Sequence, residues 1–389
     1  MNKILFIEIC NYDDFPIGGY LSFAKQMLTA FGNQLSLVGM STDETPVGKW
    51  VKKDINGISY DYFSVRKVKK SSKKSWIPAR LISYFAVRKY KKQIFSLGID
   101  NVFIQTPEVL FAIKGCKIKN PCTRIPGVEN PLSFSRYWYG KYFAKIFDFF
   151  FFKELEKIEV ILASADKNAI NRFLKRGKNI LNEEKVIQFP TRINRDIFSP
   201  SSKINARKKL KIDTSKIIIV TTGRLSTLKG WEFMLNAYIE FKKQFPESLF
   251  IFLGDGEDRL KIEDFIKANN INENVMLAGR LSHYDLSLYL NAADIYVMGS
   301  YVEGWATSLV EAIACAKPIV CTNFSSADEL VNNGYNGFII ESHNVSLFTD
   351  SMIKCFDIPK ENLLLKSNEM QKYASSNLKN SILKNWKLL

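Results

Sequence analysis

Short apolar, β-branched segments alternate with longer segments of helical periodicity along almost the whole chain. The alternation runs from residues 3–10 to residues 337–340, and segment 216–222 (KIIIVTT) is typical of the apolar runs. Strands that are buried on both faces give such uninterrupted apolar runs, and strands that alternate with helices build parallel sheets covered by helices. The sequence therefore predicts an α/β protein with parallel sheets.

Length and the position of one polar segment predict two domains. A chain of 389 residues is longer than one hydrophobic core usually supports. A polar, proline-containing segment at 194–213 separates two sets of alternating strands and helices. We therefore expect an N-terminal domain at 1–198 and a C-terminal domain at 199–366, followed by a helix-like tail at about 367–389.

Two carboxylates in the C-terminal half are eight residues apart. Glu303 precedes a glycine in a predicted loop, and Glu311 lies inside a predicted apolar helix that starts at about Trp305. Eight helical residues span roughly 12 Å, and the backbone N–H groups that open a helix bind anions. This spacing predicts a site for a ligand with hydroxyl groups at both ends and phosphate between them, as in a nucleotide sugar.

A basic, glycine-bounded loop follows the apolar segment 216–222. Arg224 and Lys229 lie between Gly223 and Gly230, and a helical pattern follows. Ligands of open α/β sheets bind at the carboxyl ends of the strands, where cations can balance the charge of a diphosphate. Because a helix N-terminus repels cations, two of them in front of one predict an anion between them.

These segments belong to an ordered series of motifs in the C-terminal half. The series is G-R-L-x-x-x-K-G (223–230), G-D-G (254–256), E-x7-E (303–311), K-P-I-V (317–320) and N-G-F (336–338). In this order and spacing the motifs resemble those of the retaining glycosyltransferases of family 4, also called group 1. The resemblance covers about 216–341 and is looser in the N-terminal half, where Gly18 and Gly19 precede a helical pattern.

The resemblance implies the GT-B fold, in which two Rossmann-like, doubly wound parallel-sheet domains face each other across a cleft. The N-terminal domain would face the acceptor and the membrane, the C-terminal domain would bind the nucleotide sugar, and the tail would pack back on the N-terminal domain. The residues implied in donor binding are Gly18, Gly19, Gly223, Arg224, Lys229, Gly279, Arg280, Leu281, Glu303, Gly304, Trp305, Ala306, Thr307, Ser308, Leu309 and Glu311.

The resemblance also implies roles for individual residues. Arg224, Lys229 and Glu303 would be catalytic, and the two cations would stabilise the departing diphosphate, so that no metal or other cofactor is required. Glu311 would accept hydrogen bonds from the ribose of a UDP- or GDP-sugar, and Glu303 from the transferred sugar. The acceptor would be a hydroxyl of a glycan or of a polyprenyl- or lipid-linked molecule in polysaccharide or glycolipid synthesis.

One feature of the N-terminal half departs from the family pattern. Family members commonly carry a histidine there that contacts the transferred sugar, whereas both histidines of this chain, His283 and His343, lie in the C-terminal half. We expect both of them at solvent-exposed or helix-edge positions. Arg124 and Glu129 lie in the corresponding region and are the candidates for the acceptor side.

Almost all of the net charge of +16 lies in the N-terminal half. Residues 1–198 contain 33 Lys and Arg against 18 Asp and Glu, and no acidic residue lies between Asp61 and Asp100. A basic helix with aromatic neighbours suits an anionic membrane, and we predict a peripheral protein on the cytoplasmic face of the cell membrane. The alternative is a solvated charged run beside a core-facing helix. The predicted membrane patch consists of Lys69, Lys70, Lys73, Lys74, Trp76, Arg80, Arg88, Lys89, Lys91 and Lys92.

Several other classes of protein fit the sequence less well. A nucleic-acid-binding protein would need a recognition helix or zinc finger, and neither is visible. Two histidines and six cysteines without C-x-x-C spacing make a metal site improbable and favour free thiols. A phosphorylase would need a cofactor-binding lysine pattern that is not visible. A nucleotide-sugar epimerase of the same fold and a non-catalytic nucleotide-sugar-binding relative stay as alternatives.

Overall fold

The computed structural model describes all residues except 1–2, 17, 71–76, 134–139, 179 and 389. The chain forms two compact units, and each is described by itself. The N-terminal unit comprises Met1–Thr191 and Ser376–Leu389, and the C-terminal unit comprises Arg192–Ser375. From the sequence we placed the division at residue 198 and the start of the tail at about 367.

The N-terminal unit contains an 8-stranded sheet with the order β3-β4-β2-β1-β5-β6-β7-β8. All neighbouring strands are parallel except β3 and β4, which form an antiparallel hairpin. The strands are β1 (Ile4–Ile7), β2 (Leu35–Ser41), β3 (Trp50–Ile55), β4 (Ile58–Lys67), β5 (Asn101–Ile104), β6 (Asn120–Ile125), β7 (Val160–Ala163) and β8 (Val186–Gln188).

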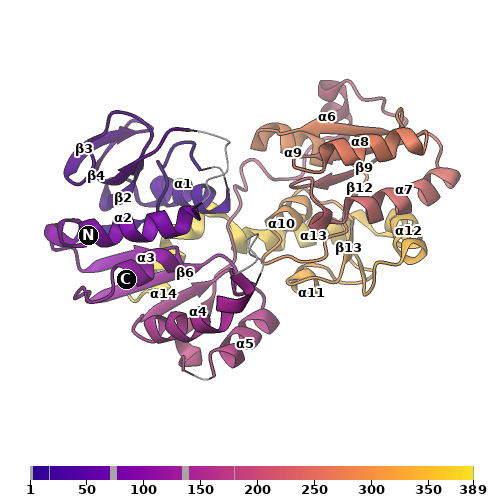
Figure 1. Cartoon of the computed structure of the whole chain (residues 1–389). Helices are drawn as coiled ribbons and strands as arrows, with labels where there is room; N and C mark the ends of the chain where they lie inside the picture. Colours follow the sequence, from indigo (N-terminus) through magenta and orange to yellow (C-terminus); the bar gives the residue numbers. More distant parts are fainter. Residues whose placement is uncertain (1–2, 17, 71–76, 134–139, 179, 389) are drawn as a thin grey trace. The chain divides into compact units, whose positions relative to one another are not determined.

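Helices cover both faces of this sheet (Figure 1). Side chains such as Leu5 and Ile7 pack on one face, while Ile4 and Phe6 pack on the other, because successive residues of a strand point to opposite sides. The first face is covered by α2 (Ala79–Ile94), α3 (Pro107–Ala112), α4 (Gly140–Leu155) and α5 (Lys167–Arg176). The second is covered by α1 (Gly19–Phe31) and by α14 (Leu378–Asn385) from the chain end.

The C-terminal unit contains a 6-stranded sheet with the order β11-β10-β9-β12-β13-β14. Its strand pairs are parallel. The order reverses between β9 and β12, as in the doubly wound dinucleotide-binding fold, and ligands of such sheets bind where the order reverses. The strands are β9 (Ile217–Thr222), β10 (Ser248–Leu253), β11 (Val275–Gly279), β12 (Ile295–Met298), β13 (Ile319–Thr322) and β14 (Gly337–Ile340).

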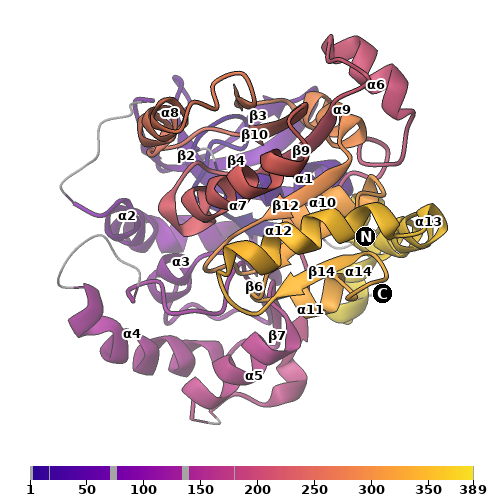
Figure 2. The same ribbon diagram turned by 90° about the vertical axis from the view of Figure 1, so that its right-hand side faces the viewer.

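This second sheet is also covered on both faces. One face carries α7 (Trp231–Gln244), α8 (Arg259–Ala268) and α12 (Val345–Lys354), and α7 and α12 lie side by side (Figure 2). The other face carries α9 (His283–Ala292), α10 (Thr307–Ala314) and α11 (Ala327–Leu330), with Met370 and Tyr373 of the chain beyond α13 (Lys360–Glu369). A further helix, α6 (Lys203–Leu210), precedes β9.

Most of the predicted strands and helices are present, but four elements of the structure were not predicted. Strand β3 pairs with β4 through a turn at Asn56-Gly57, in which both residues have positive φ. An Asn-Gly turn between two strands is a strong hairpin signal that was not used. The other three are α12, α13 and α6, and α6 lies within the segment 194–213 that we took for the connection between the domains.

Close backbone approaches explain several glycines of the motif series. A Cβ atom on Gly254 would lie 1.9 Å from the carbonyl oxygen of Gly223, and one on Gly256 would lie 2.2 Å from that of Leu225. The G-D-G motif therefore lets the loop after β10 pack against the loop after β9. A Cβ atom on Gly230 would lie 1.9 Å from the carbonyl oxygen of Gly299. Gly230 thus lets the loops after β9 and β12 meet.

The packing at Gly230 predicts that Gly230→Ala destabilises the C-terminal unit strongly. Gly334 is a matched control, because its φ of +75° is close to the +67° of Gly230, but open space surrounds its Cβ position. We expect Gly334→Ala to cost about 1 kcal/mol, the usual cost of a left-handed backbone for alanine, and Gly230→Ala to cost at least about 2 kcal/mol. Urea unfolding measures both. Equal losses would mean that the contact with Gly299 is unimportant.

Candidate functional site

Lys229 and Glu303 meet where the strand order of the C-terminal sheet reverses. Lys229 ends a short 3-10 turn (Thr227–Lys229) after β9, and Glu303 lies in the loop after β12. The Lys229 Nζ atom lies 2.5 Å from the Glu303 Oε1 atom, and the two side chains are 29% and 12% exposed. The Lys229 side chain also passes over Gly223, where it borders a small hollow at the end of β9. The sequence placed both residues in one site, and the structure brings them together.

The loop that carries Glu303 is held by contacts from three directions. The Ser300 hydroxyl donates to Glu303 Oε1 at 2.6 Å, and the Thr322 hydroxyl donates to the Ser300 carbonyl oxygen at 2.6 Å. His343 Nε2 lies 3.1 Å from the Gly299 carbonyl oxygen, and its ring stacks on Tyr301 with a centroid distance of 3.9 Å. His343 directly precedes the N-cap of α12, a helix-edge position as expected, and its half-buried ring in addition supports the loop.

Arg224 lies in the same loop as Lys229 but has a different partner. Its Nε atom donates to Glu257 Oε2 at 2.7 Å, and its side chain is 70% exposed. The two cations that were predicted to act together therefore have different partners in the structure. Lys229 lies against Glu303, while Arg224 lies with a surface carboxylate and would have to leave Glu257 to reach a ligand held by Lys229.

Glu311 lies on α10 as a half-buried carboxyl group. Within the described part of the chain it has neither a hydrogen bond nor an ion pair. Burial raises the pKa of Glu311 to about 8, since water that would stabilise the carboxylate is displaced. An acceptor of this kind is paired as a rule when it is buried, so Glu311 is available for a ligand that donates hydrogen bonds.

The hydroxyl group of Tyr296 lies in the electric field of both acids. This buried phenol on β12 lies 2.9 Å from the Thr222 hydroxyl at the end of β9 and forms a side-chain hydrogen bond with Ser308 on α10. Burial raises the pKa of Tyr296, and the negative charges of Glu311 and Glu303 raise it further. Sequence analysis missed Tyr296 and Thr222, because each lies within a strand that reads only as apolar core.

Helix α10 starts at Thr307, close to the predicted start at about Trp305, and Trp305 itself has an unexpected feature. Thr307 and Ser308 form the first turn, Leu309 is buried, and Gly304 is exposed just before the helix. The N–H group of Ala306 donates to the Ser326 hydroxyl at 3.3 Å. Trp305 is buried, and its indole Nε1–H has no acceptor within the described residues. A buried donor without an acceptor costs folding free energy. The Trp305 N–H group is therefore, after Glu311, a second polar group near this helix start that a ligand could pair with.

The loop predicted to contact a base follows β11. Gly279 has a φ of +74° and forms an isolated bridge with Gly254, so this loop lies beside the G-D-G segment. Arg280 is exposed, and Leu281 packs against the core. The loop is therefore in the same unit and at the same sheet edge as Lys229, and its contact with a base stays a prediction.

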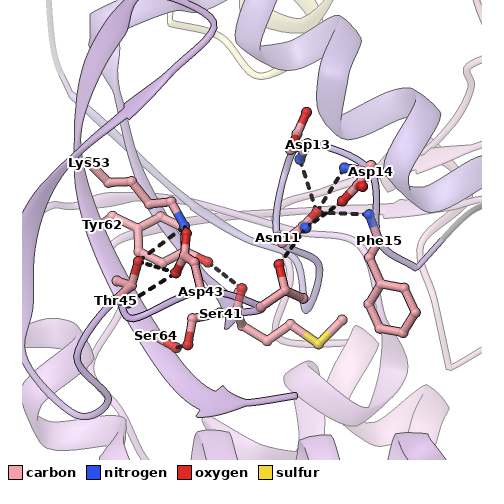
Figure 3. A network of polar contacts seen from close by, with 12 residues as sticks. Asn11, Asp13, Asp14, Phe15, Ser41, Asp43, Thr45, Lys53, Tyr62 and Ser64 are labelled. Atoms are coloured by element: carbon pink, nitrogen blue, oxygen red, sulfur yellow. Dashed lines mark hydrogen bonds and ion pairs between the residues drawn. The ribbon is translucent and has the colours of Figure 1, made fainter. Parts of the chain in front are cut away.

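In the N-terminal unit, Gly18 and Gly19 open α1, and hydrogen bonds to Asn11 hold the turn at 11–15 that precedes them (Figure 3). The side-chain oxygen of Asn11 accepts hydrogen bonds from the N–H groups of Asp13, Asp14 and Phe15 at 2.8–3.0 Å. Its amide nitrogen donates to Asp14 and to Thr42. The helix start has no side-chain cap, and its predicted contact with donor phosphates stays a prediction.

Arg124 lies at the carboxyl end of β6 and is 2% exposed. It donates to Gln105 at 3.2 Å and to Thr191 at 3.1 Å, while its Nε atom has no acceptor within the described residues. Burial lowers the pKa of Arg124 to about 10, and burial with the nearby charge of Glu108 raises the pKa of Glu8 to about 8. Glu129 is exposed and lies 3.7 Å from Arg176.

The predicted membrane patch is described in part. Lys73, Lys74 and Trp76 lie outside the described residues. Lys70 pairs with Asp14 at 2.6 Å, and Lys91 donates to the Lys114 carbonyl oxygen. Exposed positions are occupied by Lys69, Arg80, Arg88, Lys89 and Lys92.

The helix in this patch, α2, faces the core with one side and exposes part of its predicted apolar stripe. Leu81 and Phe85 of α2 are exposed, while Ser83, Val87 and Ile94 face inward. Exposed charges beside a core-facing helix, the alternative given from the sequence, thus agree with the structure, and the contact with a membrane stays a prediction. None of the helices in the described ranges is long and apolar enough to cross a bilayer.

In the described parts of the chain, no group of three or more His, Cys, Asp or Glu side chains is arranged to hold a metal ion. The six cysteines are free, and all but Cys116 are buried, which agrees with the prediction of free thiols.

Comparison with known proteins relates the C-terminal part of the chain to a family. Residues 202–376 match the model of the family described as glycosyl transferases group 1. An uncharacterized glycosyltransferase of Methanocaldococcus jannaschii is 31% identical over 189 residues, which are 47% of this chain and 46% of that protein. The UDP-Gal:alpha-D-GlcNAc-diphosphoundecaprenol alpha-1,3-galactosyltransferase of Escherichia coli is 26% identical, over 47% of this chain and 48% of the relative.

A third relative, the alpha-monoglucosyldiacylglycerol synthase of Acholeplasma laidlawii, is 28% identical over 40% of each protein. The chain thus matches about half the length of such relatives, or less. The matches support a group 1 glycosyltransferase.

Solved structures match the fold over the full length. Sucrose-phosphate synthase of Thermosynechococcus elongatus has a TM-score of 0.78 at 14% identity and covers 100% of this chain and 99% of its own. Anabaena HepE in complex with UDP-glucose has a TM-score of 0.71 at 16% identity, with 100% of both chains covered. The two parallel-sheet, Rossmann-like units therefore have the GT-B fold, as the motif series predicted.

The environment of Glu311 predicts a pH-dependent effect on stability. The folded protein keeps Glu311 protonated up to a pKa of about 8, whereas the unfolded chain ionises it near 4.5. Between these values the unfolded state holds fewer protons, so this group lowers the free energy of unfolding by up to about 1.4 kcal/mol per pH unit as pH rises. We expect Glu311→Gln to remove this loss, so that the variant gains stability over the wild type from pH 5 to pH 8.

Urea unfolding of both proteins at several pH values measures the difference. Glu273→Gln, at an exposed position of the same unit, is the matched control and should follow the wild type. Comparison with the wild type cancels the contribution of Glu8, which has a similarly raised pKa. Parallel curves for wild type and Glu311→Gln would contradict the desolvated environment assigned to Glu311.

Proposed function

We propose that the protein is a retaining, metal-independent glycosyltransferase of family 4. It would transfer a sugar from a UDP- or GDP-sugar to a hydroxyl group of a glycan or lipid-linked acceptor. The observation that carries the proposal is the position of Lys229, Glu303 and Glu311 at the carboxyl edge of the C-terminal sheet. They lie around the point where the strand order reverses, which is where doubly wound sheets bind nucleotides.

The chemistry of these side chains suits the parts of a nucleotide sugar. Lys229 supplies a positive charge at the end of β9 for the diphosphate, and the first turn of α10 supplies backbone N–H groups. Glu311 is an acceptor without a partner among the described residues, which suits two neighbouring ribose hydroxyls. Glu303 is held in place by Lys229 and Ser300 and keeps a second carboxylate oxygen for the transferred sugar.

The proposed reaction breaks the bond between the sugar and the diphosphate. Negative charge develops on the departing phosphate oxygen, and Lys229 stabilises it in the role that a metal ion has in other transferases. The acceptor hydroxyl attacks from the face of the leaving group, so the anomeric configuration is kept. The departing phosphate oxygen takes the proton of the hydroxyl, and no side chain is required as a base. Support for this stereochemistry comes from the motif series alone.

Two observations support a lipid-linked acceptor and a membrane location: the substrates for which two relatives are named, and the basic side chains of the N-terminal unit. The relatives from Escherichia coli and Acholeplasma laidlawii are named for a diphosphoundecaprenol and a diacylglycerol substrate. The N-terminal unit carries exposed basic side chains on α2, among them Arg88, Lys89 and Lys92. We therefore place the protein on the cytoplasmic face of the cell membrane, in contact with anionic lipids.

A donor screen tests the proposed activity. Common UDP-, GDP- and ADP-sugars are incubated with the protein, and hydrolysis or transfer is followed by release of the nucleoside diphosphate. We expect release from at least one UDP- or GDP-sugar. Lys229→Met should lower the turnover of that donor about 10²–10³-fold, as loss of a single charge-stabilising donor does.

Lys208→Met changes an exposed lysine of α6 in the same unit and should leave turnover unchanged. The circular dichroism spectrum and unfolding midpoint of Lys229→Met should stay close to those of the wild type. If Lys229→Met were as active as the wild type, the assignment of the leaving-group charge to this residue would fail.

Removal of divalent cations is expected to leave the activity unchanged. Since Lys229 takes the charge-stabilising role, the rate of nucleotide release in excess EDTA should equal the rate in its absence. The measurement uses the donor identified by the screen. A loss of activity in EDTA that Mg²⁺ restores would overturn the metal-independent mechanism.

Binding to vesicles tests the membrane contact. Replacement of Arg88, Lys89 and Lys92 by serine removes three exposed charges, each worth roughly 1 kcal/mol near an anionic surface. We expect co-sedimentation with phosphatidylglycerol-containing vesicles to fall at least tenfold. Serine at Lys208, Lys209 and Lys211, which lie in and next to α6 of the other unit, is the control. An equal loss for both triple variants would indicate a general charge effect.

A further inference from the structure

The N-terminal unit has a large apolar groove between α2, α3 and α4. Its volume is about 800 Å³, within the roughly 300–1,000 Å³ of typical small-molecule sites. Both walls and the floor are mainly aromatic or aliphatic. The side chains that matter for the argument are Leu81, Tyr84, Phe111, Leu132, Phe147 and Phe150.

The floor of the groove is a packed aromatic cluster, and its rim is exposed. Phe111 contacts Phe147 edge to face at 5.6 Å, and Phe147 stacks on the buried Phe151 at 5.4 Å. On the rim, Leu81 and Phe150 are 46% and 49% exposed. Apolar surface that is both exposed and continuous with a groove marks a binding site, whereas scattered exposed side chains do not.

The apolar surface continues beyond the groove along α4. Tyr142, Phe143, Ile146 and Phe149 are at least half exposed, and Phe149 does not line the groove. A helix that is apolar on its outer side as well as its inner side needs an apolar environment on both. The outer side of α4 therefore suits a hydrocarbon phase, which continues into the groove.

Basic side chains lie along the same surface. Arg80, Arg88 and Lys114 line the groove, and Lys145 and Lys153 are exposed on α4. Pairing or burial reduces the negative charge of the two acids in the lining. Lys114 and Lys157 lie 3.3 and 2.7 Å from the carboxylate of Glu154, whereas burial raises the pKa of Glu108 against the opposing effect of the Arg80 charge. The occupant of the groove should therefore be apolar and should carry negative charge at one end.

A small cavity that contains the buried Arg124 adjoins the groove. Its volume is about 50 Å³, and it shares Arg80, Pro107 and Pro131 with the groove. Arg124 lines this cavity as a buried cation with one N–H donor that has no acceptor in the described ranges. Arg80 thus lies between the apolar groove and a cavity that offers a hydrogen-bond donor.

We propose that this unit binds a membrane lipid whose long hydrocarbon chain lies in the groove and whose phosphate lies at Arg80. The polar group carried by the phosphate would then point into the cavity beside Arg124. Under the proposed function, on which this inference rests, that polar group holds the acceptor hydroxyl. The acceptor class is therefore a glycan or alcohol linked through phosphate to a long-chain lipid, and the chain itself contributes to binding.

Soluble prenyl phosphates test the groove directly, because they carry chain and phosphate without a glycan. Farnesyl phosphate, geranyl phosphate and farnesol are titrated calorimetrically below their aggregation concentrations. We expect farnesyl phosphate to bind at least tenfold more tightly than geranyl phosphate, because its longer chain fills more of the groove. Farnesol, which lacks the charge, should also bind at least tenfold more weakly. Equal affinity for both chain lengths would overturn the proposal.

Paired variants separate the groove from the surface around it. Phe150→Gln and Leu81→Gln alter exposed rim positions and should weaken farnesyl phosphate at least tenfold with folding retained. Arg80→Gln should weaken farnesyl phosphate but not farnesol. Phe149→Gln, its neighbour outside the groove, and Leu97→Gln, an exposed position beyond α2, should have no effect on farnesyl phosphate. If these two weakened it as much as Phe150→Gln, binding would be non-specific and the groove assignment would be wrong.

Titration of UDP on the same preparations keeps this inference apart from the proposed function. UDP would bind the C-terminal unit and should have the same affinity in Phe150→Gln and in the wild type. Normal UDP binding without chain-dependent binding of farnesyl phosphate would reject the lipid groove alone. A second outcome would also reject the lipid groove. If the protein self-associates, if Phe150→Gln abolishes that association and if farnesyl phosphate does not bind, a second copy of the chain covers the groove.

Discussion

The ion pair between Lys229 and Glu303 joins the two loops on which the C-terminal site depends. One loop follows β9 and the other follows β12, so the pair bridges the position where the strand order reverses. Its geometry is maintained from the backbone outward: Gly230 lets the loops touch, and Ser300 and His343 hold the second loop in place. A half-buried pair contributes little net stability, because desolvation offsets the attraction. Under the proposed function, its value would be that a cation and a carboxylate are held side by side for one ligand.

Glu311 shows the opposite arrangement, in which a half-buried acceptor has no partner in the described part of the chain. Its raised pKa means that the folded protein pays a free-energy penalty for ionising it in the absence of a ligand. Hydroxyl groups of a ligand would relieve that penalty by donating to the carboxylate. Trp305 has a buried donor in a similar state at the start of the same helix. An acceptor and a donor that both lack partners lower the stability of the folded protein. We therefore infer that ligand binding, and not stability, is the reason for these two residue types at this helix.

Sequence analysis predicted the fold class and most elements, because alternating apolar runs and helical periods are local signals. It failed where the signal was weaker or different in kind, as at β3, whose residues Lys52, Lys53 and Asp54 do not read as apolar. For the site, the spacing of Glu303 and Glu311 and the position of Lys229 were visible in the motifs. The ion pair of Arg224 with Glu257 and the contacts of Tyr296 depend on tertiary packing and were not. The same holds for the groove, since periodicity placed the stripe of Leu81 and Phe85 but not the direction in which it faces.

Hydrogen exchange measured by mass spectrometry, with and without UDP, tests the central claim most directly. The account places the nucleotide at the carboxyl edge of the C-terminal sheet, so UDP should slow exchange in peptides that cover 223–231 and 299–311. Peptides from α6 and α8 should exchange as in the free protein. Binding of UDP with protection confined to other segments of the chain, and none in the two loops around Lys229 and Glu303, would contradict the account.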